Sequence, residues 1–256
     1  LPFYLVVISS FQSEDVLTRE GFPLYIKEFS LTRYTMCLKN PTSILRAYGI
    51  TTLVTVCGTL LSIWLCTMTG YVLSRKDFCT IITTSFTISV SFFFFFTTLF
   101  SGGLVPWYII CVRYLLFKNS VLALILPMIF SVWNMIIAKS FMNSLPAAIT
   151  ESAKIDGANK WQTLKNVTIP MVMPSITICL FLTLSNSFKL FDQNLALTNG
   201  APMHNTEMLA LNIVNSFYGR VGFEGVGQAK AVMFFVIVAC IALAQLYYTR
   251  NKEVEQ

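Results

Sequence analysis

Pro146-AAITESAKIDGANKWQTLKNVTI-Pro170 is a polar segment between two apolar runs, and the rest of the chain is interpreted from it. Its composition predicts two short helices separated by a break. The residues from Ala147 to Ile155 are mostly good helix formers, and Gly157 can take the left-handed conformation that ends a helix. Ser144 is a candidate N-cap for the first helix, and Pro146 suits its first turn, where the missing N–H costs nothing.

The second helix of this segment is expected to begin after Asn159, a favourable N-cap residue, and to be limited or kinked by Pro170 and Pro174. Four of its residues recur every three positions and so share one face: Ala158, Trp161, Leu164 and Val167. A helix pair with an apolar stripe and scattered charge suits a docking surface. The residues alone leave an ordinary loop between membrane spans equally open.

The composition predicts a membrane protein. Hydrophobic residues make up 55% of the 256 residues and charged residues only 12%, whereas soluble proteins carry about a quarter. Long apolar runs then predict an all-α, polytopic transmembrane helical bundle with one embedded domain. The formal charge of +6 is better explained by loops facing anionic lipid head groups than by binding of nucleic acid.

About six spans are expected along the chain. Leu1–Ser9 is interpreted as the end of a truncated first span, and residues 10–43 as an outer loop or short surface helix. The other predicted spans are Ile44–Leu73, Ile81–Phe100, Val121–Ala138, Met171–Phe191 and Ala229–Tyr248. Between them are the 74–80 turn, an interfacial or re-entrant helix at Trp107–Phe117 and a polar outer segment from Asp192 to about Gly227. The transmembrane domain is therefore predicted at 44–248, with a polar tail at 249–256.

The sequence offers no set of residues for catalysis. It contains no G-x-x-x-x-G-K-[ST] motif, so this chain is not expected to bind ATP, and no cofactor is expected in it. Its one histidine, His204, cannot anchor a catalytic set and has no partners at metal-ligand spacing. The seven cysteines lie mostly in apolar runs and are expected to behave as small buried hydrophobes. An enzyme is therefore not expected.

The polar segment resembles the EAA loop of ABC-importer permeases, whose pattern is Glu-Ala-Ala, three residues, Gly, nine residues, Ile-x-Leu-Pro. Glu151, Ala153, Gly157 and Pro170 stand at the matching positions with the spacing intact. The mild departures are Ser152, Val167 and Ile169. The Asp-Gly-Ala at residues 156–158 has the form common in carbohydrate importers.

The resemblance implies a type I ABC-importer permease fold in a bacterial or archaeal plasma membrane. The implied partners are a second permease subunit, two cytoplasmic ATPase subunits that bind the ATP, an extracytoplasmic solute-binding protein and a sugar substrate. The cytoplasmic coupling loop would cover about residues 142–170. Its expected coupling residues are Glu151, Ala153, Asp156, Gly157, Ala158, Trp161, Leu164 and Pro170, with Ile155 adding to the packing surface.

A second stretch of sequence, at residues 186–206, gives an expectation for the class of substrate. Residues 186–206 resemble the Phe-x-x-Phe-Asp … Leu-Thr-x-Gly-Gly-Pro … Thr stretch of maltose F-type and glycerol-phosphate A-type permeases, with Ala201 in place of the second glycine. Residues 101–120 resemble the maltose G-type instead. The expected substrate-pathway residues are Asn186, Phe188, Phe191 and Asp192, since aromatic faces and amides suit sugars. An aromatic belt at the membrane interface is the alternative for each of them.

The distribution of basic residues gives weak support for an orientation in the membrane, and two other functions remain open. With the motif loop, the 74–80 turn and the C-terminus in the cytoplasm, eight of the eighteen Lys and Arg residues lie inside, so their number does not favour this orientation. The inner segments are shorter than the outer ones, and only the density of basic residues along them favours it. An ion-coupled secondary carrier remains an alternative, although such carriers usually show intramembrane carboxylates, which the predicted spans almost lack. A membrane scaffold without transport activity is the other alternative.

Overall fold

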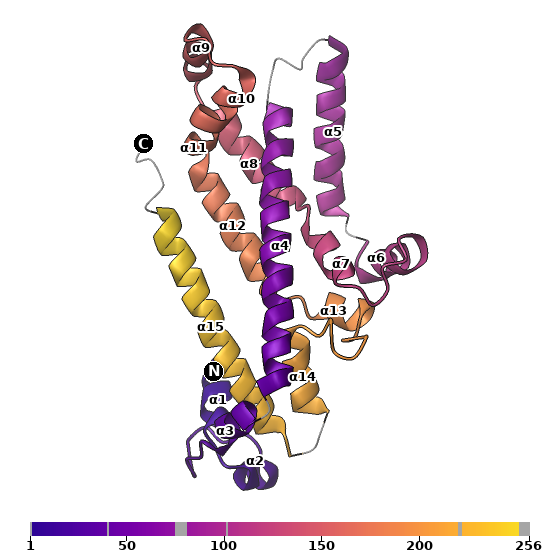
Figure 1. Cartoon of the computed structure of the whole chain (residues 1–256), viewed down its shortest axis with the longest axis vertical. Coiled ribbons are helices and arrows are strands. Elements are labelled where there is room, and N and C mark those ends of the chain that lie inside the picture. The colour runs from indigo at the N-terminus through magenta and orange to yellow at the C-terminus, as the bar shows by residue number, and fades with distance from the viewer. Residues whose placement is uncertain (1, 40, 75–80, 101, 220–221, 251–256) are drawn as a thin grey trace. The chain divides into compact units, whose positions relative to one another are not determined.

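A computed structural model describes residues 2–39, 41–74, 81–100, 102–219 and 222–250, so the predicted 75–80 turn, Cys79 and the tail beyond Arg250 lie outside it. The described residues are helical apart from turns and one isolated bridge between Gln12 and Phe29 (Figure 1). The α-helices are α1 Pro2–Ser10, α2 Glu14–Glu20, α3 Thr32–Lys39, α4 Pro41–Ser74, α5 Ile81–Leu99, α6 Leu104–Ile109, α7 Val121–Ile125, α8 Val132–Ser144, α9 Ala147–Ile155, α10 Lys160–Thr163, α11 Ile169–Met171, α12 Met173–Phe188, α13 Asp192–Leu197, α14 Leu209–Tyr218 and α15 Glu224–Arg250. Three short pieces differ in winding: the π-helical turns η2 Ile110–Tyr114 and η4 Leu164–Thr168, and the 3₁₀ turn η3 Leu126–Met128.

The all-α membrane fold predicted from the sequence is confirmed. Within the described residues, three helical segments are long and apolar enough to cross a membrane alone: Pro41–Ser74, Val121–Ser144 and Glu224–Thr249. Two further pairs of helices pass the same test jointly, α5 with α6 and η2, and α10–α11 with α12, which brings the number of candidate spans to at most five. At nine residues, α1 is too short to span a bilayer.

Several predicted boundaries were wrong. Residues 10–43 contain two helices, α2 and α3, in place of a loop with at most one. The segment 192–227, expected to be polar, forms α13, α14 and the start of α15, and it buries residues such as Asn194, Leu197 and Leu211. The span predicted to end at Ala138 continues to Ser144, after an interruption between Leu126 and Ser131, where Pro127 cannot donate a backbone hydrogen bond.

The chain divides into two compact units made of alternating stretches of sequence. The first unit comprises Leu1–Thr55, Pro106–Leu124 and Phe188–Ala242, and the second comprises Val56–Val105, Ile125–Ser187 and Leu243–Gln256. The coupling-loop residues belong to the second unit. The end of α12 and the segment that follows it belong to the first.

The long helix α4 buries its small and polar side chains and exposes its large ones. Its buried face is formed by Ala47, Thr51, Val54, Thr55, Gly58, Thr59, Ser62, Cys66, Thr67 and Gly70. Leu53, Leu60 and Trp64 are exposed. This inversion is typical of a membrane helix, because small residues let neighbouring backbones approach while large apolar residues face lipid.

In the second unit, α4 packs closely against α8. A side chain at Gly70 would place its Cβ 3.1 Å from the backbone nitrogen of Lys139, so the backbones touch at this point. Four residues earlier on α4, the Cys66 thiol donates to the carbonyl of Ser131 at 3.4 Å. The helix α8 is in turn bound to α12, since Asn134 Nδ2 donates to Thr183 Oγ1 at 2.7 Å. These three helices therefore form the core of the second unit.

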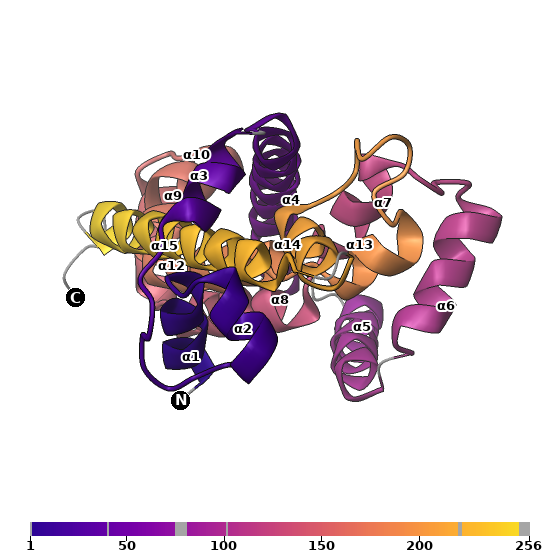
Figure 2. The ribbon, with the colours of Figure 1, turned by 90° about the horizontal axis from the view of Figure 1, so that it is seen from below.

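The first unit gathers two groups of short helices. The helices α6, α7 and α13 lie together around the buried residues Cys111, Ala123 and Leu197 (Figure 2). Elsewhere in this unit, Cys37 of α3 packs with Val226 and Ala229 of α15. The helix α14 is bonded to α4 through the backbone N–H of Leu209, which donates to Thr51 Oγ1 at 2.9 Å. A polar pocket lies between α3, α4, α14 and α15 and is described below.

Candidate coupling loop

The first half of the candidate loop ends as its sequence predicts. The helix α9 runs from Ala147 to Ile155, and Gly157 has φ +81°, the left-handed conformation that glycine adopts without strain. The backbone N–H of Ala158 then donates to the carbonyl of Ala153 at 2.9 Å, which is the long-range bond of a Schellman motif. The carbonyl groups at the end of α9 are thus partly satisfied, and the chain reverses sharply.

The second half begins with a reciprocal cap. The backbone N–H of Gln162 donates to Asn159 Oδ1 at 2.8 Å, and the backbone N–H of Asn159 donates to Gln162 Oε1 at 2.9 Å. The predicted cap at Asn159 is confirmed, but its partner Gln162 was missed. The signal was present in the sequence, since Asn followed three residues later by Gln is a capping-box pattern.

The predicted N-cap at Ser144 was wrong. Ser144 is the last residue of α8, and its hydroxyl donates to the carbonyl of Phe141 at 2.8 Å. A serine hydroxyl can either cap the following helix or bond back into the preceding turn. Because α8 extends to Ser144, the hydroxyl bonds back into α8. Pro146 accepts a bond from the backbone N–H of Ile149 at 3.2 Å, as suits the turn that opens α9.

The apolar residues of the loop separate into exposed and buried ones. Ile155 is 85% exposed and Trp161 62% exposed, and Glu151 and Asp156 are exposed as well. Leu164, which was expected to pack on a partner from the same stripe, is only 4% exposed and is buried within the chain itself. The three-residue spacing placed Leu164 on one face with Trp161, whereas Leu164 is the first residue of η4, which packs against α9. Ala153 and Ala158 are half-buried.

Two prolines shape the exit from the loop. Pro170 lacks the N–H that would bond to an earlier carbonyl, and the helix accommodates this with the π-helical turn that precedes it. At Val172 the backbone leaves the helical conformation, and α12 then starts at a bend of 71° to the segment Trp161–Met171. The predicted kink is therefore present, and the single residue Val172 separates the loop segment from α12.

The four expected substrate-pathway residues have different environments. Asn186 is exposed, whereas Phe188 is buried and its ring lies 6.0 Å from the ring of Phe234. Phe191 is half-buried just before α13, and Asp192 is exposed as the first residue of that helix. Phe188 thus contributes to packing within the first unit. Asn186 and Asp192 keep their side chains accessible.

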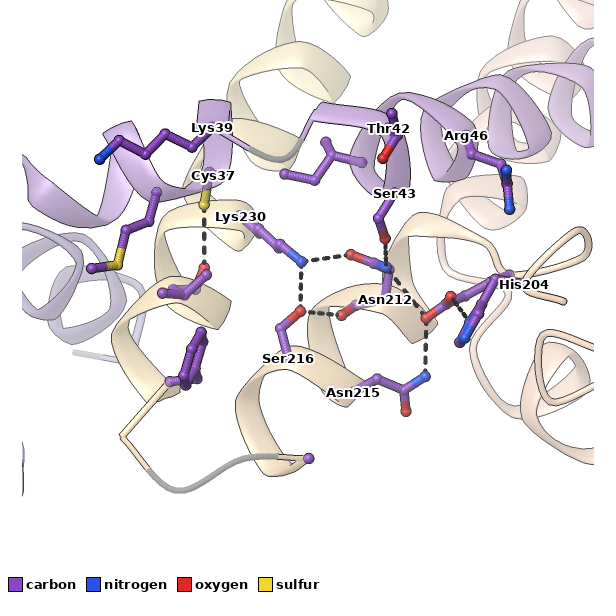
Figure 3. A pocket seen from close by; sticks show the side chains of 16 residues that line it. Cys37, Lys39, Thr42, Ser43, Arg46, His204, Asn212, Asn215, Ser216 and Lys230 are labelled. Atoms are coloured by element: carbon purple, nitrogen blue, oxygen red, sulfur yellow. Dashed lines mark hydrogen bonds and ion pairs between the residues drawn. The ribbon is translucent and has the colours of Figure 1, made fainter.

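The structure also contains a polar pocket that the sequence analysis did not identify (Figure 3). Its volume is about 650 Å³, and it lies within the first unit. Lys230 of α15 lies at its inner wall, 9% exposed, with its ammonium bonded to Asn212 Oδ1 at 2.8 Å and Ser216 Oγ at 2.6 Å. Glu207, also buried, accepts bonds from Asn212 and Asn215. A lysine seven residues into a membrane-length helix was the available signal, because such charges are rare and usually functional.

Comparison with known proteins agrees with the resemblance to ABC-importer permeases. Residues 58–253 match the model of the family described as binding-protein-dependent transport system inner membrane component. This match covers most of the chain. The chain therefore belongs to that family of inner-membrane permease components. The resemblance to ABC-importer permeases that the sequence indicates is thus confirmed.

Individual relatives agree with this assignment. Over 121 residues the chain is 50% identical to a probable starch degradation products transport system permease of Thermoanaerobacterium thermosulfurigenes, covering 47% of this chain and 41% of that protein. Over 182 residues it is 35% identical to a polygalacturonan/rhamnogalacturonan transport system permease of Bacillus subtilis, covering 71% of this chain and 61% of that protein. In both alignments the chain matches less than two thirds of the relative's length.

A solved structure shares the fold. It belongs to a bacterial ABC transporter involved in the import of the acidic polysaccharide alginate, and it matches this chain with a TM-score of 0.77 at 19% identity. The match covers 99% of this chain and 90% of that chain. The type I importer permease architecture expected from the sequence is therefore found in the structure.

Proposed function

We propose that this chain is a permease subunit of an ATP-driven, binding-protein-dependent importer, and that its cargo is a sugar or oligosaccharide. The family assignment supports the transport role, and the names of the two relatives support a carbohydrate cargo. A second permease subunit would complete the membrane pathway. Two ATPase subunits would bind on the cytoplasmic side, and a solute-binding protein would deliver the sugar from outside.

The observation that carries this proposal is the exposed apolar tip of the α9–α10 hairpin. Ile155 and Trp161 stay accessible on a rigid turn, although apolar side chains of this size gain free energy when they are buried. Trp is also among the residues that dominate binding free energy at protein interfaces. Glu151 adds an accessible carboxylate to the same hairpin, suited to a basic residue of the partner. A cleft in an ATPase subunit would accommodate such a hairpin.

The connection from this hairpin to the membrane provides the route for coupling. Between Lys160 and Met171 the chain is continuously helical, and only Val172 separates this segment from α12. The helix α12 is joined to α8 by the hydrogen bond between Asn134 and Thr183. When the ATPase subunits close on nucleotide, a displacement of the hairpin would move α12 and α8 with it, as in rigid-body switching.

The substrate pathway is proposed for the accessible polar residues at the end of α12. Asn186 offers an amide for sugar hydroxyl groups, and Asp192 offers a carboxylate directly after the aromatic ring of Phe191 in the sequence. Phe188 would hold this arrangement in place through its contact with Phe234. In this proposal, Phe188 positions the pathway and does not line it.

Reconstitution in vesicles tests the proposed function. The chain would be inserted together with its neighbouring permease and ATPase subunits, and binding protein with labelled maltodextrin would be supplied outside. The expected result is uptake that requires both the binding protein and ATP inside the vesicle. Uptake that persists without the ATPase and collapses with an ion gradient would indicate the secondary carrier instead. Partner binding without uptake of any tested sugar would indicate the scaffold.

A further inference from the structure

The polar pocket of the first unit contains a buried cation, Lys230, that makes no direct ion pair with any described carboxylate. In the described part of the chain, no carboxylate lies within ion-pair distance of the Lys230 ammonium, whose two bonds go to the neutral groups of Asn212 and Ser216. An ammonium has three N–H donors, so one remains available. The buried carboxylate of Glu207 is linked to this ammonium only through Asn212, which bonds to both. A ligand in the open pocket beside it can therefore take the remaining donor.

The single acidic group of the pocket is already satisfied. Glu207 accepts from Asn212 Nδ2 at 3.3 Å and from Asn215 Nδ2 at 3.0 Å, and its other oxygen pairs with His204 Nδ1 at 2.6 Å. Two more cationic side chains, Lys39 and Arg46, lie at the exposed rim. With three lysine and arginine groups against one carboxylate, the pocket carries a net positive charge and favours an anion.

The remaining polar groups of the pocket are suited to hydroxyl groups. Ser43 Oγ accepts from Asn212 Nδ2 at 3.2 Å, and its own O–H points to no acceptor among the described residues. The amide oxygen of Asn215 is likewise without a donor in this part of the chain, since only its Nδ2 is bonded. Ser43 and Asn215 thus contribute a hydroxyl donor and an amide acceptor to the lining of the same pocket as Lys230 (Figure 3).

We infer that this pocket binds a sugar acid, with its carboxylate on Lys230 and its hydroxyl groups on Ser43 and Asn215. A volume of about 650 Å³ lies within the range of small-ligand sites and accommodates a mono- or disaccharide. The site goes beyond the proposed function, because the pocket is separate from the coupling loop and its occupation needs neither ATP nor an ATPase subunit. The bound carboxylate would give the buried ammonium the direct ion pair that Glu207, bonded to it only through Asn212, does not make.

Direct binding to the purified full-length chain in detergent tests this inference. Titration calorimetry would compare three probes: galacturonate, galactose, which replaces the carboxylate with a hydroxymethyl group, and inorganic phosphate, which is anionic but has no sugar hydroxyls. The inference expects saturable binding of galacturonate that is at least tenfold tighter than that of either other probe. No binding of galacturonate, or equal binding of galactose or of phosphate, would overturn it.

Substitutions then locate the site. Lys230→Met is expected to weaken galacturonate binding by about tenfold or more, because it removes one charge-assisted hydrogen bond. Lys230→Arg keeps the charge and should retain most of the affinity. The matched control is Lys118→Met, which removes an exposed lysine of the same unit outside the pocket. If Lys230→Met fails to fold, Asn215→Ala at the exposed side of the pocket replaces it, with a smaller loss expected. Unchanged galacturonate binding in a folded Lys230→Met or Asn215→Ala variant would contradict the assignment.

Discussion

Asn159 and Gln162 satisfy each other's backbone N–H groups with their side chains, through bonds of 2.8 and 2.9 Å. This reciprocal cap lies two residues after Gly157, so the turn between α9 and α10 is fixed on both sides. A hairpin held in this way keeps the exposed side chains of Ile155 and Trp161 at a defined distance from α12. Its rigidity is what a lever that transmits a displacement requires.

Removal of the cap is expected to loosen the start of α10. Asn159→Ala leaves the backbone N–H of Gln162 without its acceptor and should cost the local helix about 0.5–2 kcal/mol. Hydrogen exchange of the backbone amides at 160–164 should accelerate accordingly. The control is Asn166→Ala, an exposed asparagine of the same segment that caps no helix. Equal exchange rates in both variants would show that the reciprocal cap does not stabilise the turn.

Exposed and buried apolar residues of the loop should respond differently to truncation. Trp161→Ala is expected to weaken binding of the ATPase subunit by about tenfold or more, since a buried interface tryptophan commonly contributes that much. The thermal stability of the isolated chain should stay unchanged, because the Trp161 side chain is 62% exposed.

Leu164→Ala is the matched comparison for Trp161→Ala. Leu164 is 4% exposed, so its truncation should lower the stability of the loop by about 2–5 kcal/mol. The two quantities to measure are the melting temperature in detergent and the affinity for the ATPase subunit by surface plasmon resonance. A drop in melting temperature for Trp161→Ala with unchanged affinity would contradict the proposed docking surface.

Gly157 should tolerate no side chain without cost. At φ +81° an alanine is strained by about 1–2 kcal/mol, although no neighbouring atom lies within 4 Å of its Cβ position. Gly157→Ala should therefore reduce sugar uptake in vesicles at normal expression. Gly49→Ala is the control, because Gly49 is helical, equally open and without positive φ, so this substitution should preserve uptake. Full uptake by Gly157→Ala would show that the turn conformation is not required.

Much of the loop could be predicted from sequence because its structure is local. The bounds of α9, the left-handed Gly157, the cap at Asn159 and the kink near Pro170 each depend on residues within one or two turns. Leu164 could not be assigned in the same way. Leu164 belongs to η4, which packs against α9, and a spacing rule along one helix does not show this packing between segments.

The polar pocket could not be predicted either, because its residues come from distant parts of the sequence. Ser43, Glu207, Asn212 and Lys230 are up to 187 residues apart, and no local pattern joins them. The 192–227 segment was interpreted as an outer loop from its polar residues, yet Asn194 uses its side chain to bond the carbonyl of Thr206 and the backbone N–H of Met208. Polar residues that satisfy one another in a buried network cannot be told from solvated ones by composition.

The pH dependence of stability should reveal the half-buried carboxyl group of Glu14 on α2. Burial raises the pKa of Glu14 above its ordinary value of 4.5, although Arg33, whose Nε lies 3.2 Å from the carboxylate, opposes this. Glu224 and Asp15 raise the pKa further. Because the folded state then holds its proton more tightly than the unfolded state, stability should fall as the pH rises from 4.5 through the raised pKa.

Melting curves of the full-length chain in detergent would measure this trend. Glu14→Gln cannot ionise, so the decline should be reduced in this variant. The control is Glu20→Gln, an exposed glutamate at the end of the same helix, in which the decline should persist. A decline of the same size in wild type and Glu14→Gln would assign the effect to another group.

Sugar uptake by Glu151→Lys tests most directly the central claim, that energy from ATP enters through the α9–α10 hairpin. The variant would be reconstituted with its partner subunits, binding protein and internal ATP, beside Glu20→Lys as a charge reversal on an exposed residue of the first unit. The account predicts that Glu151→Lys inserts at the wild-type level and that its uptake falls to background, while Glu20→Lys transports normally. Normal uptake by Glu151→Lys would contradict the account.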